Sequence, residues 1–107
     1  MKEIIVTTAN EIPNKKIIQV LGIVRGNTVR ARNIGRDIGA VFKNIIGGEV
    51  KAYTELTVQS RDEAYNRMVN EAIKLGANGI VGMRFSTSTV MQGASEMLAY
   101  GTAVKLK

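Results

Sequence analysis

Apolar residues recur at helical spacing in two neighbouring segments near the middle of the chain. The longer segment runs from about residue 49 to residue 75, and its apolar stripe includes Ala64, Met68 and Ala72. The shorter segment covers residues 34–46 and carries a similar stripe. Gly47-Gly48 separates the two segments, and glycine readily follows a helix C-terminus. The pattern therefore predicts an αα-hairpin, which is two helices joined by a very short turn.

The second predicted helix is too long for a compact monomer. At about 1.5 Å per residue it would be roughly 40 Å long, whereas a compact chain of this length has a radius of gyration of about 13 Å. Weak helix formers between Thr54 and Ser60 mark where the helix could break. The apolar row continues before that zone, however, at Val50 and Tyr53. We therefore predict an unbroken helix whose N-terminal half packs in an oligomer.

Four other segments carry the β-branched residues and the alternation that are typical of strands. They are residues 4–8, 17–31, 80–91 and 96–106, and residues 92–95 fit a hairpin connection between the last two. Residues 17–31 are predicted to form one long strand or a bent hairpin. Within this segment Gly22 suggests a bulge or a close backbone approach, and Gly26-Asn27 suggests a tight turn or a bend.

The predicted order is strand, strand, helix, helix, strand, strand, with no alternation of strands and helices. This order predicts a single α+β domain over residues 1–107, with two layers, a mainly antiparallel sheet and the helices on one side. The last strand has small residues on one parity, which would let a helix come close: Ala99, Gly101 and Ala103. The side chains predicted to fill the core include Met68, Met83, Met91 and Met97.

The sequence contains no cysteine and no histidine. Their absence removes thiolate and imidazole metal ligands, the commonest general base and every Cys/His nucleophile arrangement. No paired-carboxylate or other nucleophile motif replaces them, so the sequence predicts neither catalysis nor a cofactor. The N-terminal apolar run is too short for a signal peptide, and no stretch approaches the roughly 20 apolar residues of a membrane span. We expect a cytoplasmic protein with no membrane partner.

The net charge of +6 comes from one region of the chain. Eight basic and only two acidic residues lie between residues 14 and 51, whereas the remaining charges balance. Arg30, Arg32 and Arg36 surround the expected helix start at Asn33. Backbone N–H groups at that start, together with guanidinium forks, would hold a phosphate or a carboxylate. The alternatives are a solvated basic face, or arginines paired across a subunit contact.

Other binding chemistries have weaker signals. Asp37, Glu49 and Glu96 are candidate oxygen ligands for a hard cation such as magnesium or calcium, but their spacing matches no known loop. They would otherwise form ion pairs with Arg36 or Arg61, or place charge at a helix end. The basic segment could bind RNA weakly, although the chain has few aromatic residues that could stack on bases.

Short motifs along nearly the whole chain carry a family resemblance. The motifs are Val24-Arg25-Gly26, Ala31-Arg32-Asn33-Ile34-Gly35-Arg36-Asp37, Gly47-Gly48-Glu49 with Tyr53, Gly76-Ala77-Asn78 with Val81-Gly82, and Glu96 with Tyr100-Gly101-Thr102-Ala103-Val104. In this combination the chain resembles the YbjQ-like family of small bacterial and archaeal proteins, which is sometimes labelled heavy-metal-binding. The resemblance implies a dodecin-like α+β subunit that assembles into a pentameric ring or stacked rings, with short extra strands joining the subunits.

Taken together, the residues and the resemblance predict a non-enzymatic, homo-oligomeric binding or scaffold protein. It is expected to hold a small anionic ligand between its subunits. The alternatives are a protein that binds a hard cation or another metal, as the family label suggests, and a weak RNA binder.

Overall fold

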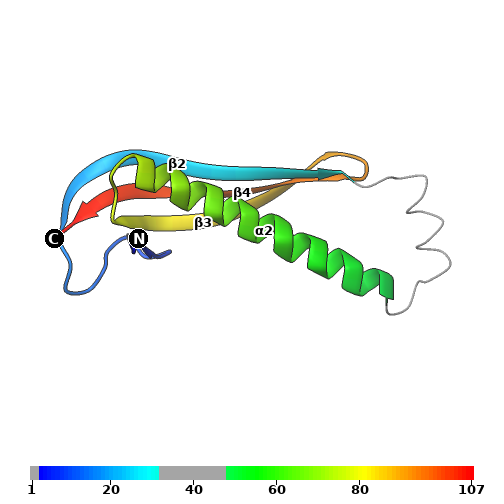
Figure 1. Cartoon of the computed structure of the whole chain (residues 1–107), viewed down its shortest axis with the longest axis horizontal. Helices are drawn as coiled ribbons and strands as arrows, with labels where there is room; N and C mark the ends of the chain where they lie inside the picture. Colours follow the sequence, from blue (N-terminus) through cyan, green and yellow to red (C-terminus); the bar gives the residue numbers. More distant parts are fainter. Residues whose placement is uncertain (1–2, 32–47) are drawn as a thin grey trace.

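The computed structural model describes residues 3–31 and 48–107. Its elements are β1 (Ile5–Val6), β2 (Ile17–Ala31), α2 (Gly48–Lys74), β3 (Gly79–Met91) and β4 (Ala94–Leu106) (Figure 1). The expected first helix over residues 34–46, and with it the αα-hairpin, lies outside the described residues. The described part therefore follows the order strand, strand, helix, strand, strand, and it confirms the predicted α+β class.

The four strands form one sheet in the order β1-β3-β4-β2. β4 pairs antiparallel with both β2 and β3, while the two-residue β1 pairs parallel with the start of β3. The sheet is therefore mainly antiparallel, as predicted. The hairpin between β3 and β4 turns at Gln92 and Gly93, a shorter connection than expected, because β4 already begins at Ala94.

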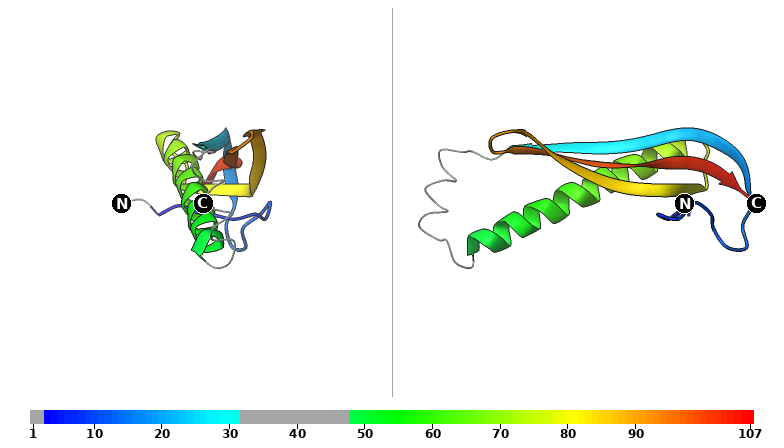
Figure 2. Two further views of the ribbon diagram at one scale, coloured as in Figure 1. Left: turned by 90° about the vertical axis from the view of Figure 1, so that its right-hand side faces the viewer. Right: turned by 180° about the vertical axis from the view of Figure 1, so that it is seen from behind.

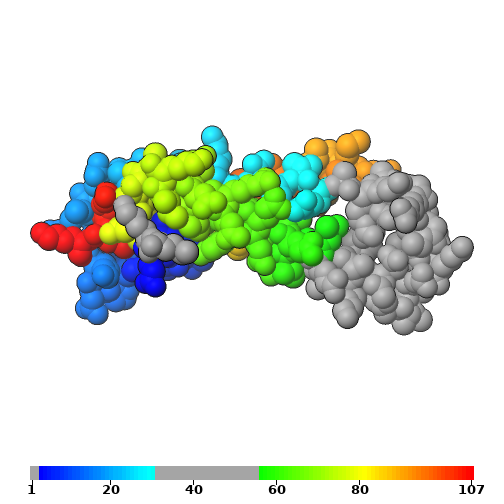
Figure 3. Space-filling view, viewed as in Figure 1, coloured from blue at the N-terminus to red at the C-terminus, as the bar shows by residue number. Residues whose placement is uncertain are grey.

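α2 lies against one face of the sheet, so the molecule has two layers (Figure 2). The helix packs mainly on β2 and β4 and scarcely touches β3. It runs for 27 residues through the zone of weak helix formers, which confirms the prediction of one unbroken helix. Its side chains from residue 56 onward, green to yellow-green in Figure 3, cover the middle of the near face of the molecule. Over its described residues α2 is not apolar enough to cross a membrane.

The core forms where the C-terminal half of α2 meets the sheet. Every fourth residue of the helix is buried there, in the row Ser60, Ala64, Met68 and Ala72. The buried residues that pack with this row include Val24, Ile80, Met83, Ala99 and Ala103. Because several of these side chains are alanines, the helix lies close to β4, as the small residues of that strand predict. Met91 was predicted to fill the core, but its side chain is 64% exposed next to the hairpin turn.

Gly26 lies directly beneath α2 and does not form the predicted turn or bend. β2 runs straight through it, paired residue by residue with β4 from Gly22 to Ala31. A Cβ atom at Gly26 would lie 2.2 Å from the carbonyl oxygen of Ala64 and 2.4 Å from the amide nitrogen of Met68. Glycine is therefore needed for the close approach of the helix backbone. Gly22, by contrast, has φ 131° beside a shift in register, which confirms the predicted bulge.

α2 ends in a Schellman motif at Gly76. The N–H of Gly76 donates to the carbonyl of Ile73 at 2.9 Å, and the N–H of Ala77 donates to the carbonyl of Ala72 at 3.0 Å. Gly76 has φ 85°, the left-handed conformation that this motif requires. The residue is therefore needed for its backbone conformation.

Replacing Gly76 by alanine is expected to lower the free energy of unfolding by about 1 kcal/mol, because an L residue is strained at positive φ. The new Cβ would meet only the end of the Lys105 side chain, at 3.9 Å, so no overlap adds to this cost. Urea denaturation at a fixed protein concentration measures the difference. Gly76→Asn is the matched control, because asparagine tolerates this conformation and should lose clearly less. An unchanged urea midpoint for Gly76→Ala would contradict the assigned role.

Candidate functional site

The candidate site residues from the sequence lie on three different elements of the described part. Arg30 is near the end of β2, Glu49 is in the first turn of α2 as predicted, and Glu96 is near the start of β4. The candidates that lie outside the described residues are Arg32, Arg36 and Asp37. Of the three arginines of the predicted anion site, Arg30 alone therefore lies within the described residues, 3–31 and 48–107.

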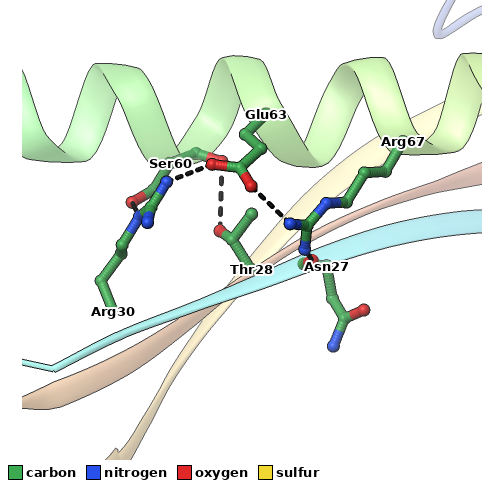
Figure 4. A network of polar contacts seen from close by, with 6 residues as sticks. All are labelled: Asn27, Thr28, Arg30, Ser60, Glu63 and Arg67. Carbon is green, nitrogen blue, oxygen red and sulfur yellow. Dashed lines mark hydrogen bonds and ion pairs between the residues drawn. The ribbon is translucent and has the colours of Figure 1, made fainter.

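Arg30 belongs to a polar network that joins β2 to α2 (Figure 4). Its Nη2 forms an ion pair with Oε2 of Glu63, and Oε1 of the same carboxylate pairs with Nη2 of Arg67. One glutamate therefore bridges two guanidinium groups that come from different elements. Arg30 is already ion-paired within its own chain.

Hydrogen bonds around these ion pairs hold the same two elements together. Nε of Arg30 donates to the hydroxyl of Ser60 at 3.2 Å, and Nη1 of Arg67 donates to the backbone carbonyl of Asn27 at 2.5 Å. The buried hydroxyl of Thr28 donates to the backbone carbonyl of Ser60, also at 3.2 Å. The helix–strand interface therefore continues as a polar contact beyond the end of the apolar core.

This network is electropositive and open to water. The side chains of Arg30, Glu63 and Arg67 are 38%, 36% and 54% exposed. Water screens pairs at such exposure, and a single one adds only about 0–1 kcal/mol of stability. A single carboxylate cannot neutralise two guanidinium groups, so the three side chains retain one positive charge. The arrangement can therefore still attract an anion.

Sequence reasoning found Arg30 but missed its partners. Glu63 and Arg67 are four residues apart, the spacing at which side chains meet on a helix, so their own pairing had a local signal. Their meeting with Arg30 joins positions 33 residues apart in the chain and depends on how α2 lies on β2. No local pattern shows such a contact.

Glu96 lies on the sheet face that α2 does not cover. It is opposite Val29 on β2 and Ser88 on β3, and its Oε2 accepts a hydrogen bond from Nδ2 of Asn27 at 3.1 Å. Among the residues that the structure describes, no three acidic side chains lie close enough together to hold a metal ion. The structure thus places Glu96 beside an amide group, which donates to its carboxylate.

The sheet face away from α2, called the outer face below, exposes a row of apolar side chains. Their exposed fractions are 65% for Val20, 77% for Ile23, 55% for Val29 and 38% for Tyr100. The other end of the outer face is covered, because Val81, Val104 and Leu106 pack there with Ile12 and Ile17. The open part of the outer face therefore exposes these apolar side chains to water, interspersed with polar and charged ones such as Arg25, Asn27 and Glu96.

Both edges of the sheet are open along much of their length in the described part. β2, which is 15 residues long, has a hydrogen-bonded neighbour on one side only. β3 is bordered by the N-terminal segment as far as Met83, and residues 3–31 and 48–107 provide no neighbour on that side beyond it. Unpaired strand edges readily pair with another chain.

A family model with the description "Putative heavy-metal-binding" matches residues 4–107. The chain is also similar to the UPF0145 protein of Archaeoglobus fulgidus, with 55% identity over 106 residues that cover 99% of this chain and 98% of the relative. The UPF0145 protein of Thermotoga maritima is 50% identical over 103 residues, covering 96% of this chain and 97% of the relative. The name of these relatives states no reaction, ligand or partner.

A solved structure has a similar fold. It is a crystal structure of a protein of unknown function from Pediococcus pentosaceus that belongs to the DUF74 family. The TM-score is 0.65 at 18% sequence identity, and the match covers 97% of this chain and 98% of that chain. At this identity the likeness concerns the fold alone.

The heavy-metal description does not fit the donor atoms of this chain. Soft and borderline metals prefer thiolate and imidazole ligands, and the sequence contains neither cysteine nor histidine. The described residues also offer no cluster of carboxylates in their place. We therefore assign no metal site to them.

Proposed function

Since the chain belongs to the YbjQ-like family, as the match over residues 4–107 shows, we propose that it is the subunit of a homo-oligomeric scaffold. The scaffold binds a small anion and catalyses no reaction. The observation that carries the proposal is the open part of the outer face, with its row of exposed apolar side chains. The proposed cover for this face is a second copy of the same chain.

The outer face supplies a driving force for association. Val20, Ile23 and Val29 come from one strand, and each is more than half exposed. Burying an aliphatic side chain of this size stabilises a protein by about 1.5–3 kcal/mol. A contact that covers these three side chains therefore offsets part of the entropy that is lost on association.

The open edges of the sheet favour a ring. β2 and β3 both run antiparallel to β4, so they run parallel to each other at opposite sides of that strand. The free edge of β2 in one copy can therefore pair with the free edge of β3 in the next copy, always in the same sense. A head-to-tail contact of this kind closes into a ring when its rotation allows. We propose five copies, the number that the family resemblance implies.

The electropositive network around Arg30 supports the anionic ligand of this proposal. Arg30 is close to the end of β2, the strand whose free edge belongs to the proposed subunit contact. A ligand held there would lie between neighbouring subunits. RNA is a weaker candidate, because only 5% of the residues are aromatic and single-strand recognition depends on stacking.

Native mass spectrometry of the untagged protein tests the assembly. We expect a discrete mass near five times 11.6 kDa, with a reproducible excess where an anion copurifies. Ile23→Lys should shift the population to monomers, because the contact would bury an unpaired charge. Ile73→Lys makes the same change at an exposed position of α2 and should leave the mass unchanged. A wild-type monomer at micromolar concentration, or an intact Ile23→Lys ring, would contradict the proposal.

A further inference from the structure

Two arginines from different elements converge on a single carboxylate. Arg30 reaches Glu63 from β2, and Arg67 reaches the same carboxylate from the next turn of α2. The two guanidinium groups approach separate oxygens of Glu63, and hydrogen bonds from charged guanidinium groups are among the stronger ones that carboxylates and phosphates accept. The Glu63 side chain thus occupies the position that an anionic ligand would take.

Several donors of this site remain available. Arg30 uses Nε and Nη2, and Arg67 uses Nη1 and Nη2, for the contacts within the network. Among the described residues, Nη1 of Arg30 and Nε of Arg67 have no hydrogen-bond partner. The hydroxyl of Ser60, a residue that is only 6% exposed, accepts from Nε of Arg30 and so helps to hold this guanidinium group in place. An incoming anion would therefore find more donors than Glu63 alone engages.

The charges indicate which anion fits. Glu63 supplies one negative charge to two positive ones, whereas a phosphate monoester carries about 1.5 to 2 negative charges at pH 7 and has three acceptor oxygens. Free phosphate is a mixture of monoanion and dianion at that pH. In the dianionic form such a ligand would neutralise both arginines, which a monocarboxylate cannot do. All three charged side chains are more than one third exposed, so the ligand can enter and Glu63 can swing out into water. The bond from Thr28 to the carbonyl of Ser60 does not involve Glu63, so α2 stays attached to β2.

We propose that Arg30 and Arg67 form a phosphate-binding site in which Ser60 holds Arg30 in place, and that Glu63 is its internal competitor. The carboxylate occupies the site in the free protein and is displaced by a phosphate dianion. This inference rests on the anion-binding part of the proposed function. To that proposal it adds phosphate as the class of ligand, Arg67 as the second arginine, and Glu63 as the residue that limits the affinity.

Titration of the untagged, full-length protein with inorganic phosphate tests the site, by calorimetry or by the amide NMR signals of residues 27–30 and 60–67. Glu63→Gln keeps the size of the side chain and removes the competing charge. It should therefore lower the dissociation constant for phosphate about tenfold or more. Glu71→Gln is the matched control, because it removes the same charge from an exposed position two turns further along α2. It acts on the site only through long-range electrostatics, so it should change the dissociation constant by less than about twofold. Glu63→Ala is a second variant of the same kind, with the same expected direction.

Further variants and ligands sharpen the test. Adding Arg67→Gln to the Glu63→Gln protein should abolish its higher affinity for phosphate. Adding Arg25→Gln, on the opposite face of β2, should leave that higher affinity in place. Phenyl phosphate that binds more tightly than inorganic phosphate would identify a phosphate monoester as the ligand, and the reverse order would identify free phosphate. Acetate should bind much more weakly than either.

The outcomes separate this inference from the proposed function. Equal phosphate affinity in the wild-type, Glu63→Gln and Glu63→Ala proteins would overturn the role of Glu63. If Arg30→Gln alone removed binding while changes at Glu63 and Arg67 had no effect, the inference would fail and the anion-binding part of the proposed function would stand. If no variant bound phosphate, the site would fail, while the mass of the assembly would still decide the scaffold proposal.

Discussion

Replacement of Gly26 by alanine is expected to lower the free energy of unfolding by about 3 kcal/mol. The added Cβ would come within 2.2 Å of the carbonyl oxygen of Ala64 and 2.4 Å of the amide nitrogen of Met68. Both atoms belong to the backbone of α2, so no side-chain rotation relieves the overlap. The helix would have to move away from β2, which would open the core and disturb the contact between Arg30 and Ser60.

Urea denaturation of wild-type and variant proteins at one protein concentration measures this effect. Asn27→Ala is the control on the neighbouring residue of the same strand. Its side chain is exposed and, among the described residues, bonds to Glu96 alone, so the change should cost no more than about 1 kcal/mol. If Gly26→Ala were as stable as Asn27→Ala, the helix could not lie as close to β2 as the structure places it.

Replacement of Met68 by alanine is expected to cost about 2–5 kcal/mol, the range for deleting a large buried side chain. Met68 is fully buried in the middle of the row that α2 presents to the sheet. Its neighbours in the core are mostly alanines, together with Val24, Ile80 and Met83. Small neighbours on a rigid sheet cannot collapse into the vacated space, so a cavity should remain and add to the lost burial.

Met91→Ala makes the same chemical change at a methionine that is 64% exposed. Surface substitutions of this kind usually change stability by no more than about 0.5 kcal/mol. Thermal or urea unfolding of the two variants side by side provides the comparison. Similar losses for Met68→Ala and Met91→Ala would show that the core is not centred on the row from Ser60 to Ala72.

The regular elements are predictable because their signals are local. The apolar stripe predicts a helix from about residue 49 to residue 75, and α2 spans Gly48–Lys74. The alternation of residues predicts the last strand. It also predicts that one face of this strand carries small residues, and Ala99 and Ala103 on that face pack against the helix. A repeat within one segment reports which face that segment buries, whatever covers it.

Gly26 shows where local reasoning fails. A Gly-Asn pair is a strong turn signal, because both residues tolerate positive φ. In the structure φ at Gly26 is not positive, and the absence of a side chain serves the approach of α2 to the strand. Glycine is required where φ is positive and also where another backbone comes too close for a Cβ atom. The sequence alone does not distinguish these two reasons. Met91 is a similar case, since an apolar residue next to a turn can face water.

The candidate site was only partly predictable for the same reason. The cluster of positive charge that contains Arg30 is visible in the sequence as an excess of basic over acidic residues. Glu63, Arg67 and Ser60 belong to a different element, and their pattern reports an exposed helix face with an ordinary pair four residues apart. Only the packing of α2 on β2 brings the two sets of side chains together.

The sequence by itself determined the α+β class, the long unbroken helix, the mainly antiparallel sheet and the family of this chain. These properties follow from periodicity, composition and short motifs, which act over a few neighbouring residues. The tertiary structure decided that Gly26 lies under the helix, that Glu63 joins two arginines and that Val20, Ile23 and Val29 stay exposed on the outer face. Each of these depends on contacts between segments that are far apart in the chain, and their distances are set only when the whole core packs.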